Sequence, residues 1–197
     1  HFVICANVIG SCLGSSGPAT VNPATDKPWG MDFPVVTIRD FVNVQKLVLE
    51  SLGIQKLHAV VGPSMGSMQA IDWASAYPKW VPRMLSVIGT GHSDAWTTAL
   101  LEQWTVPIKL DPNWQDGDYY EKTPPTEGLI AALMFITQDA LTPEFFNQVG
   151  ESDAVKHQAL ESGPLHSIHQ SHKIVKWLRG RAESRAAISD ANHLLYL

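Results

Sequence analysis

The sequence predicts an α/β fold, in which helices cover a mostly parallel sheet, followed by a second part that is mostly helical. Three observations support this prediction. Residues 1–91 alternate between short apolar runs and helical patterns, in the order strand, helix, strand, helix, strand. Residues 92–197 contain helical patterns and no convincing strand. A serine between two glycines, in GPSMG, lies where the second strand should meet the second helix.

The chain is expected to begin with a strand and a long loop. Residues 2–6 form a short apolar run with β-branched members, which predicts a buried strand. Residues 7–34 are rich in Gly, Pro, Ser and Asn, which predicts a loop. Thr37 is then expected to cap a helix, with Asp40 three residues later as in a capping box. Apolar residues recur at helical spacing as far as Gly53, where the helix should end.

The second strand and helix surround the serine. Residues 57–61 are predicted to form a strand, and residues 65–76 a helix that stops before Pro78. Residues 84–90 are predicted to form a third buried strand. Because strand and helix alternate, the three strands should lie parallel in one sheet.

Residues 92–197 are expected to form a helical cap, or lid, and residues 1–91 to form part of the core that carries the sheet. Thr142 followed by Pro143 is a typical helix start. Four large apolar residues are candidates either for facing a cavity or for packing inside the cap: Trp104, Trp114, Met134 and Phe135. The other helical patterns cover residues 94–104, 126–138 and 173–181.

Composition excludes several classes of partner. A chain of 197 residues with 45% hydrophobic content can bury one substantial core, or a core and a smaller appended unit. The net charge of −5 argues against a surface for nucleic acid or for anionic membranes. The longest apolar runs are too short to cross a bilayer. Cys5 and Cys12 match neither a disulfide framework nor a metal motif, and they fit a reduced, cytoplasmic location.

The first residues, HFVICANVIG, open directly on a strand-like run without a cap or a leader. Natural chains rarely begin inside a strand. We therefore expect the sequence to be a piece of a longer protein, and any signal peptide would belong to another part of it.

The stretch VVGPSMGSMQ has the pattern of a sharp turn that presents a serine nucleophile between a strand and a helix. Gly62 and Gly66 flank Ser64, and side chains at these two positions are expected to collide with the neighbouring strand or helix. The backbone amide of Met65 would begin the helix and stabilise an oxyanion. The alternative is a tight turn that happens to contain a serine.

A serine hydroxyl needs a base, normally a histidine that a carboxylate orients, and in this kind of fold both follow the serine in the chain. None of the histidines after Ser64 follows a strand-like run. The three in HSIHQSH lack acidic or cysteine ligands nearby, so we interpret them as solvated helix residues. No metal and no cofactor is predicted. The histidines that follow Ser64 in the chain are His92, His157, His166, His169, His172 and His193.

Four stretches, taken in order, resemble a known family. They are the segment from FVICANVIG to LVLESLGI, then AVVGPSMGSMQAIDWASAYP, LDPNWQDGDYYEKTPPTEGL and DANHLLYL. Together they resemble the homoserine O-acetyltransferase family of the α/β-hydrolase superfamily, nearly from end to end.

The resemblance implies where the missing parts of a catalytic site lie. In the family, a segment before the present first residue supplies the second oxyanion amide, and the triad aspartate and histidine follow the position of Leu197. The remaining segments of the same protein would therefore supply the base. The family also implies a homodimer formed through cap helices.

Two departures from the family bear on function. Pro63 and Ser67 replace glycines of the usual elbow, and Pro63 can adopt the backbone angle needed before the turn. Leu133 and Ala140 occupy the positions at which transferases of the family carry an Arg and a Tyr that hold the amino-acid substrate. Losing a cation there should weaken the binding of a carboxylate.

Three functions follow from these residues. The first is a serine esterase, in which Ser64 attacks a short-chain ester and water releases the acyl group. The second is acyl transfer from acyl-CoA to homoserine, as the family name states. The third is a binding scaffold without catalysis. The apolar residues Leu133 and Ala140 favour the esterase over the transferase, and the intact elbow argues against the scaffold.

Overall fold

The computed structural model describes residues 2–152 and 167–197, so two of the histidines considered above, His157 and His166, lie outside the described residues. The chain divides into two compact units. One runs up to Ala99 and includes Tyr196–Leu197, and the other is Leu100–Leu195.

The first unit begins with an irregular segment, as predicted for residues 7–34. Its regular elements are short and lie close to its end: a two-stranded antiparallel sheet and one turn of 3-10 helix. They are β1 (Val21–Asn22), β2 (Lys27–Pro28) and η1 (Gly30–Asp32). The Tyr196 hydroxyl donates hydrogen bonds to the carbonyls of Met31 and Phe33, which ties the end of the chain to this segment.

Helix α1 (Ile38–Ser51) has the predicted capping box. The Thr37 side chain accepts from the Asp40 amide, and the Asp40 carboxylate accepts from the Thr37 amide at 2.8 Å. These two bonds satisfy backbone groups that a helix start otherwise leaves open. Hydrogen bonds from Thr37 also hold the pKa of Asp40 below its usual value.

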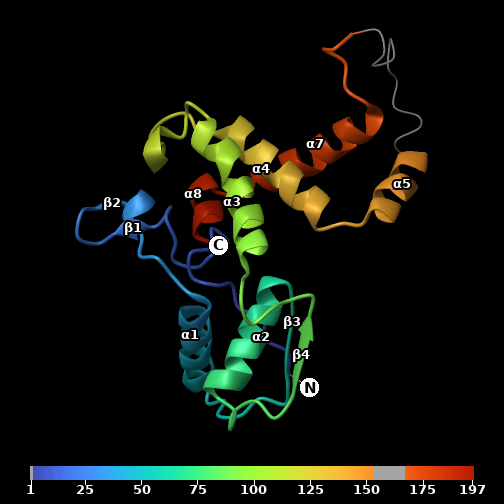
Figure 1. The fold of residues 1–197 in the computed structure, drawn as a ribbon. Coiled ribbons are helices and arrows are strands. Elements are labelled where there is room, and N and C mark those ends of the chain that lie inside the picture. Colours follow the sequence, from blue (N-terminus) through green and yellow to red (C-terminus); the bar gives the residue numbers. More distant parts are fainter. Residues whose placement is uncertain (1, 153–166) are drawn as a thin grey trace. The chain divides into compact units, whose positions relative to one another are not determined.

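Strands β3 (Val60–Pro63) and β4 (Met84–Val87) pair in parallel, with Val60 opposite Met84 and Pro63 opposite Val87. Helix α2 (Met65–Ala76) packs against both strands, and α1 packs against α2 (Figure 1). This arrangement confirms two of the three predicted parallel strands and their cover of helices. The third strand, predicted as buried over residues 84–90, is wrong in its burial and its end, because every residue of β4 is exposed and the strand ends at Val87. A core cluster of Val42, Leu49, Trp73 and Val81 fills the unit.

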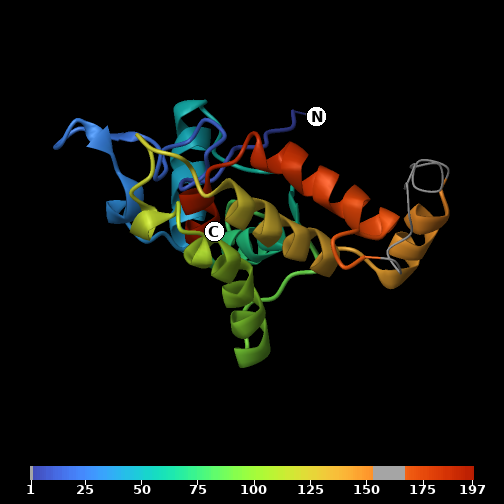
Figure 2. The same cartoon turned by 90° about the horizontal axis from the view of Figure 1, so that it is seen from above.

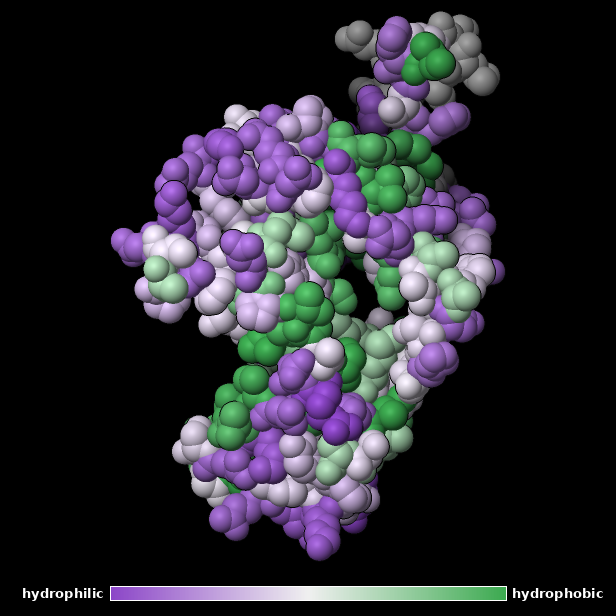
Figure 3. Space-filling model, turned by 60° about the vertical axis from the view of Figure 1, so that its left-hand side comes forward, coloured by the Kyte–Doolittle hydropathy of each residue, from purple (hydrophilic) through white to green (hydrophobic). Residues whose placement is uncertain are grey.

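The predicted strand at residues 2–6 is wrong for the described chain, because these residues have no strand assignment. A strand exists only when its backbone groups pair with a neighbour, and the described residues supply no neighbour here. The apolar side chains that suggested burial are open to solvent: Phe2 is 83% exposed and Val3 is 85% exposed. Figure 3 shows further apolar residues, in green, lying open on the face of the molecule that it presents.

The second unit is helical, and within its described residues no strand is present, as predicted. Helices α4 and α7 lie side by side (Figures 1 and 2). Its core cluster includes Ile108, Tyr119, Ala132 and Leu133. The elements of this half of the chain are α3 (Ala95–Leu110), η2 (Gln115–Gly117), α4 (Thr126–Asp139), α5 (Pro143–Glu151), α7 (Lys173–Ala186) and α8 (Ala191–Tyr196).

No single helix in the described chain has both the length and the apolar composition needed to cross a membrane. Taken together, α4 and α5 meet that test of length and composition, although they are bent by 107° at the break between them.

Candidate active site

The turn at Ser64 has the geometry that the sequence predicts. Strand β3 ends at Pro63, α2 begins at Met65, and Ser64 between them has φ 51° and ψ −121°. Positive φ is uncommon for a residue with a side chain, and such strain clusters at functional sites. The turn is therefore an elbow between a strand and a helix rather than part of a regular helix.

The Ser64 hydroxyl makes no hydrogen bond that caps the helix which follows it. Serine at the position before a helix normally accepts a hydrogen bond from the second or third helical amide. Here the Ser64 side chain makes no such capping bond, and the residue is exposed. A hydroxyl in this position is open to a substrate.

The space around Gly62 leaves no room for a side chain. A Cβ atom at Gly62 would lie 2.1 Å from the carbonyl oxygen of Gly66, which is a backbone atom and cannot turn aside. Among the described residues, a Cβ at Gly66 would meet only the Pro63 side chain, at an ordinary 3.5 Å. Within the described chain, the predicted steric need for glycine is thus right for Gly62 and wrong for Gly66, because no described backbone atom lies within 4 Å of the place where a Gly66 Cβ would be.

Strand β4 fixes the elbow from the other side. The Ser64 amide donates to the Val87 carbonyl at 3.0 Å, which extends the β3–β4 pairing by one bond. The hydroxyls of Ser67 and Ser86 lie 2.5 Å apart, and Ser67 is fully buried. Gly89 also packs here, because a Cβ at that position would fall 2.3 Å from the Ser67 side chain. Ser67, a departure from the family pattern, is therefore a packed and hydrogen-bonded part of the elbow.

Met65 is the first residue of α2, and its amide has no acceptor within the helix, as at any helix start. The first turn of α2 carries no acidic residue that would offset the positive end of the helix dipole. An oxyanion formed on a carbonyl attacked by Ser64 would be stabilised at such an end. The geometry suits the predicted role of the Met65 amide.

A base for Ser64 is not found in the described part of the chain. Within residues 2–152 and 167–197, no hydrogen bond joins a histidine to the Ser64 hydroxyl. Two members of the histidine cluster, His169 and His172, are exposed. The described residues contain no group of three His, Cys, Asp or Glu side chains that could hold a metal.

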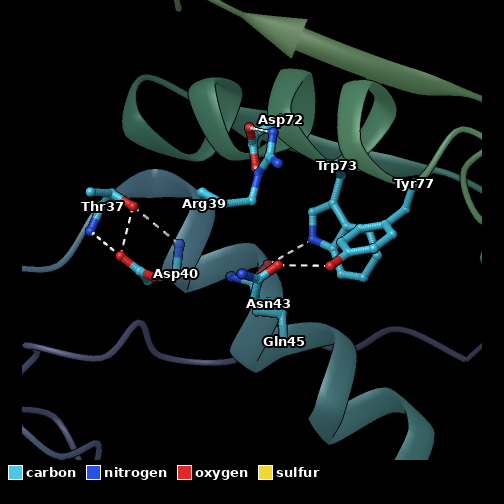
Figure 4. A network of polar contacts seen from close by, with 8 residues as sticks. All are labelled: Thr37, Arg39, Asp40, Asn43, Gln45, Asp72, Trp73 and Tyr77. Carbon is cyan, nitrogen blue, oxygen red and sulfur yellow. Dashed lines mark hydrogen bonds and ion pairs between the residues drawn. The ribbon is translucent and has the colours of Figure 1, made fainter.

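A set of polar contacts between α1 and α2 holds the elbow helix in place (Figure 4). Gln45 on α1 accepts from the Trp73 indole at 2.8 Å and donates to the Gln69 side chain at 2.6 Å. Gln69 is buried, and its amide group lies 3.5 Å from the Met65 carbonyl at the start of α2. The Gln45 side chain thus reaches the first turn of α2 through Gln69.

Two further pairs lie along the same helices. Arg39 holds the Asp72 carboxylate with two hydrogen bonds of 2.7 and 2.8 Å, and the Tyr77 hydroxyl donates to Asn43 at 2.7 Å (Figure 4). These polar pairs fix the position of α2 along α1, and with it the position of the elbow. In the sequence, the only indication that Arg39 and Asn43 position α2 is that both side chains are polar.

The two residues predicted to line the substrate pocket lie in different environments. Leu133 is 2% exposed and belongs to the core of the helical unit. Ala140 is exposed and follows the last residue of α4. Among the described residues, the structure does not bring these two together in a pocket. Their predicted role in substrate binding stays a prediction.

The four large apolar residues that were candidates for a cavity also differ in their burial. Trp114 and Met134 are partly buried and pack on the core of the helical unit. Trp104 is half-buried and donates to Asp139 at 2.7 Å. Phe135 is 51% exposed. Core packing is therefore the role seen for the first two.

The helical unit contains a buried polar network that sequence reasoning missed. Asn192 is fully buried, and its side chain accepts from the Trp114 indole at 3.0 Å and donates to the Tyr120 hydroxyl at 3.1 Å. The Asp190 carboxylate accepts from the hydroxyls of Tyr119 and Tyr120 at 2.6 and 3.1 Å. The strings DPNWQDGDYY and DANHLLYL, both noted in the sequence, thus meet in the fold.

Burial raises the pKa of Tyr119 above its usual range, and the hydrogen bond to Asp190 raises it further. The pKa of Tyr120 is also raised, by burial first and then by the negative charge of Asp190. Both phenols are therefore kept neutral as donors. The network is a structural feature of the helical unit that fastens α8 to its core.

Comparison with known proteins places the chain in a family. A family model described as the alpha/beta hydrolase fold matches residues 1–141. The chain belongs to this family, whose fold accounts for the parallel strands and for the elbow between β3 and α2.

Within that family the chain is similar to homoserine O-acetyltransferases and to an esterase. The homoserine O-acetyltransferase of Natronomonas pharaonis is 38% identical over the whole chain, which covers 50% of that protein. The crystal structure of the homoserine O-acetyltransferase from Bacillus anthracis is 31% identical, with a TM-score of 0.80 over 92% of this chain and 48% of that one. The crystal structure of esterase E22 is 61% identical, with a TM-score of 0.87 over 96% of this chain and 53% of that one. The chain thus spans about half the length of these relatives.

Proposed function

We propose that the complete protein hydrolyses short-chain carboxylic esters through an acyl intermediate on Ser64. The observation that carries the proposal is the elbow, in which a strained serine with an uncommitted hydroxyl follows a strand and precedes a helix start. In the proposed reaction the Ser64 oxygen attacks the ester carbonyl, and the Met65 amide stabilises the oxyanion. The alcohol leaves, and water then releases the acid.

The similarity at 61% identity to a protein named as an esterase supports hydrolysis as the outcome. The aspartate and histidine that would activate Ser64 are assigned to the remaining segments of the same protein. No metal or cofactor takes part in this proposal. A cytoplasmic location, a homodimer formed through cap helices, and the division into a core at residues 1–91 and a helical cap at residues 92–197 also remain proposals.

Acyl transfer from acyl-CoA to homoserine is the second candidate, since the curated relatives carry that name. It is ranked below hydrolysis because of Leu133 and Ala140. A zwitterionic acceptor that meets an isobutyl and a methyl group loses hydration without a replacement partner, a penalty of about 1–3 kcal/mol per unmet group. Leu133 is also buried in the apolar core of the helical unit. A scaffold without catalysis ranks below both.

One comparison tests the choice. The complete protein is assayed for hydrolysis of an aryl acetate and for acetylation of homoserine from acetyl-CoA, with Ser64→Ala as the blank. Hydrolysis should be the faster reaction, and Ser64→Ala should lower it by several orders of magnitude, since the members of a triad act as a unit. Robust homoserine acetylation with negligible ester hydrolysis would contradict the proposal.

A further inference from the structure

A second strained residue lies beside Ser64. Strands β3 and β4 are in register with Pro63 opposite Val87, so the next residues of the two strands are Ser64 and Ile88. The Ser64 amide donates to the Val87 carbonyl at 3.0 Å, and this carbonyl belongs to the peptide bond that leads into Ile88. The two residues therefore leave the same edge of the sheet next to each other.

Ile88 has φ 50°, almost the same value as the 51° of Ser64. A β-branched residue with positive φ is a genuine outlier, because its side chain crowds the backbone in this region. Glycine or asparagine would make the same turn without this strain. A turn that retains isoleucine keeps a particular side chain at a conformational cost, which points to a use for that side chain.

The backbone around Ile88 is held firmly against the elbow. A Cβ at Gly89 would fall 2.3 Å from the Ser67 side chain and 3.0 Å from the Ser64 carbonyl oxygen. Ser86 on the other side is joined to Ser67 through their hydroxyls. In contrast to this tight backbone, the Ile88 side chain is 84% exposed among the described residues. The backbone of an apolar residue is thus held beside the serine, and its side chain does not belong to the described core of its unit.

We propose that Ile88 is a specificity-determining residue of the Ser64 site, which contacts an alkyl group of the ester substrate. This inference rests on the proposed function, because it takes Ser64 as the acylated residue. The alkyl group belongs either to the acyl part or to the alcohol part of the ester, and both offer the same apolar chemistry. Contact with either part should make the rate depend on the length of that part.

The test uses the complete protein and two variants at this position. Ile88→Ala removes most of the side chain, and Ile88→Asn places a polar residue that tolerates positive φ. Val35→Ala is the matched control, since Val35 is also β-branched, lies in the same unit and is 86% exposed. One series of p-nitrophenyl esters varies the acyl chain from acetate to hexanoate. A second series of acetate esters varies the alcohol from ethyl to hexyl.

Both Ile88 variants should lower the ratio of kcat/KM for the longest ester to that for the shortest by about 3–10-fold in one series, which identifies the part that is contacted. Val35→Ala should leave both ratios unchanged. Unchanged ratios in both series for the Ile88 variants would overturn the inference. An equal loss for every ester, with a lowered melting temperature, would also overturn it, because Ile88 would then only pack against other parts of the protein.

The inference and the proposed function can fail separately. If the wild-type protein acetylates homoserine and does not hydrolyse esters, the esterase proposal fails. The acyl series is then repeated with acetyl-, butyryl- and hexanoyl-CoA as donors. A changed ratio with these donors would support the role of Ile88 in either reaction, and an unchanged ratio would overturn it.

Discussion

At the scale of single residues, the elbow depends on the space beside Gly62. In the complete protein, Gly62→Ala would force the new methyl group against the Gly66 carbonyl oxygen, 2.1 Å away. The strand and the helix would have to separate, so we expect a destabilisation of about 1–3 kcal/mol and loss of most ester hydrolysis. Urea unfolding and kcat/KM measure the two effects.

Gly66→Ala is the matched control for this prediction. Its methyl group would meet only ordinary contact, and alanine is favoured over glycine inside a helix by about 1 kcal/mol. Stability should therefore stay the same or rise. If the two variants are equally damaging, the distinction drawn between the two glycines is wrong.

The turn at Ser64 could be predicted from the sequence because all of its signals are local: two glycines, an apolar run before them and a helical pattern after them. The different needs of Gly62 and Gly66 could not be predicted in this way. They depend on which side of each glycine faces backbone, and that is set by the crossing of β3 and α2. The burial of Leu133 likewise depends on the packing of α4 and not on its own segment.

At the scale of elements, buried polar contacts join α2 to α1 beside their shared apolar cluster. In the complete protein, Gln45→Met keeps the size of the side chain and removes its hydrogen bonds to Trp73 and Gln69, both of which are buried. Leaving buried polar groups unpaired costs about 1–3 kcal/mol each. We expect a total loss of about 2–4 kcal/mol in the free energy of unfolding, measured by urea denaturation.

Arg39→Met provides the comparison within the same pair of helices. It breaks the two bonds to Asp72, but the Arg39 side chain is 52% exposed, and exposed ion pairs contribute only about 0–1 kcal/mol. A loss as large as that of Gln45→Met would show that the exposed pair, rather than the buried amide, fixes the helix.

Helices were easier to predict than strands in this chain. Helix α2 has the predicted bounds, and the first residues of α1 and α5 follow their capping threonines, because caps and apolar spacing lie within a few residues of each other. Strand β3 begins three residues later than predicted, and residues 2–6 form no strand. Pairing with a neighbour decides both outcomes, and no pattern within the strand itself encodes that neighbour.

At the scale of the whole molecule, the tyrosine network should make stability sensitive to alkaline pH. Tyr119 and Tyr120 have pKa values raised above the ordinary value of 10 in the folded state. Above about pH 10 the unfolded chain loses these protons while the folded chain keeps them, so stability falls as pH rises. Below pH 10 the two phenols bind protons in both states, and the effect is absent.

Urea unfolding of the complete protein between pH 8 and 11 measures this slope. Tyr119→Phe should make the decline above pH 10 shallower and should also lower stability at pH 8, because Asp190 loses a buried donor. A tyrosine titration followed by absorbance should show phenols that ionise only when the protein unfolds. Normal ionisation of all tyrosines near pH 10 would contradict the raised pKa values.

This network also marks the limit of what the sequence could predict. The strings DPNWQDGDYY and DANHLLYL both belong to the stretches that resemble the family, but the partners Tyr119 and Asp190 within them are 71 residues apart. Periodicity describes only neighbours along the chain. The contact follows from the way the helical unit folds back on itself.

The hydrogen bond from Tyr196 to the Phe33 carbonyl has a consequence for the order of synthesis. The two residues are separated by 163 positions, so the segment around η1 leaves the ribosome long before the phenol that satisfies its carbonyls. At about 5–20 residues per second, the delay is roughly 10–30 s. During that interval Phe33 also lacks the ring that later packs edge-on against it at 5.5 Å. A nascent chain that stops before Tyr196 would therefore expose this segment to chaperones and proteases.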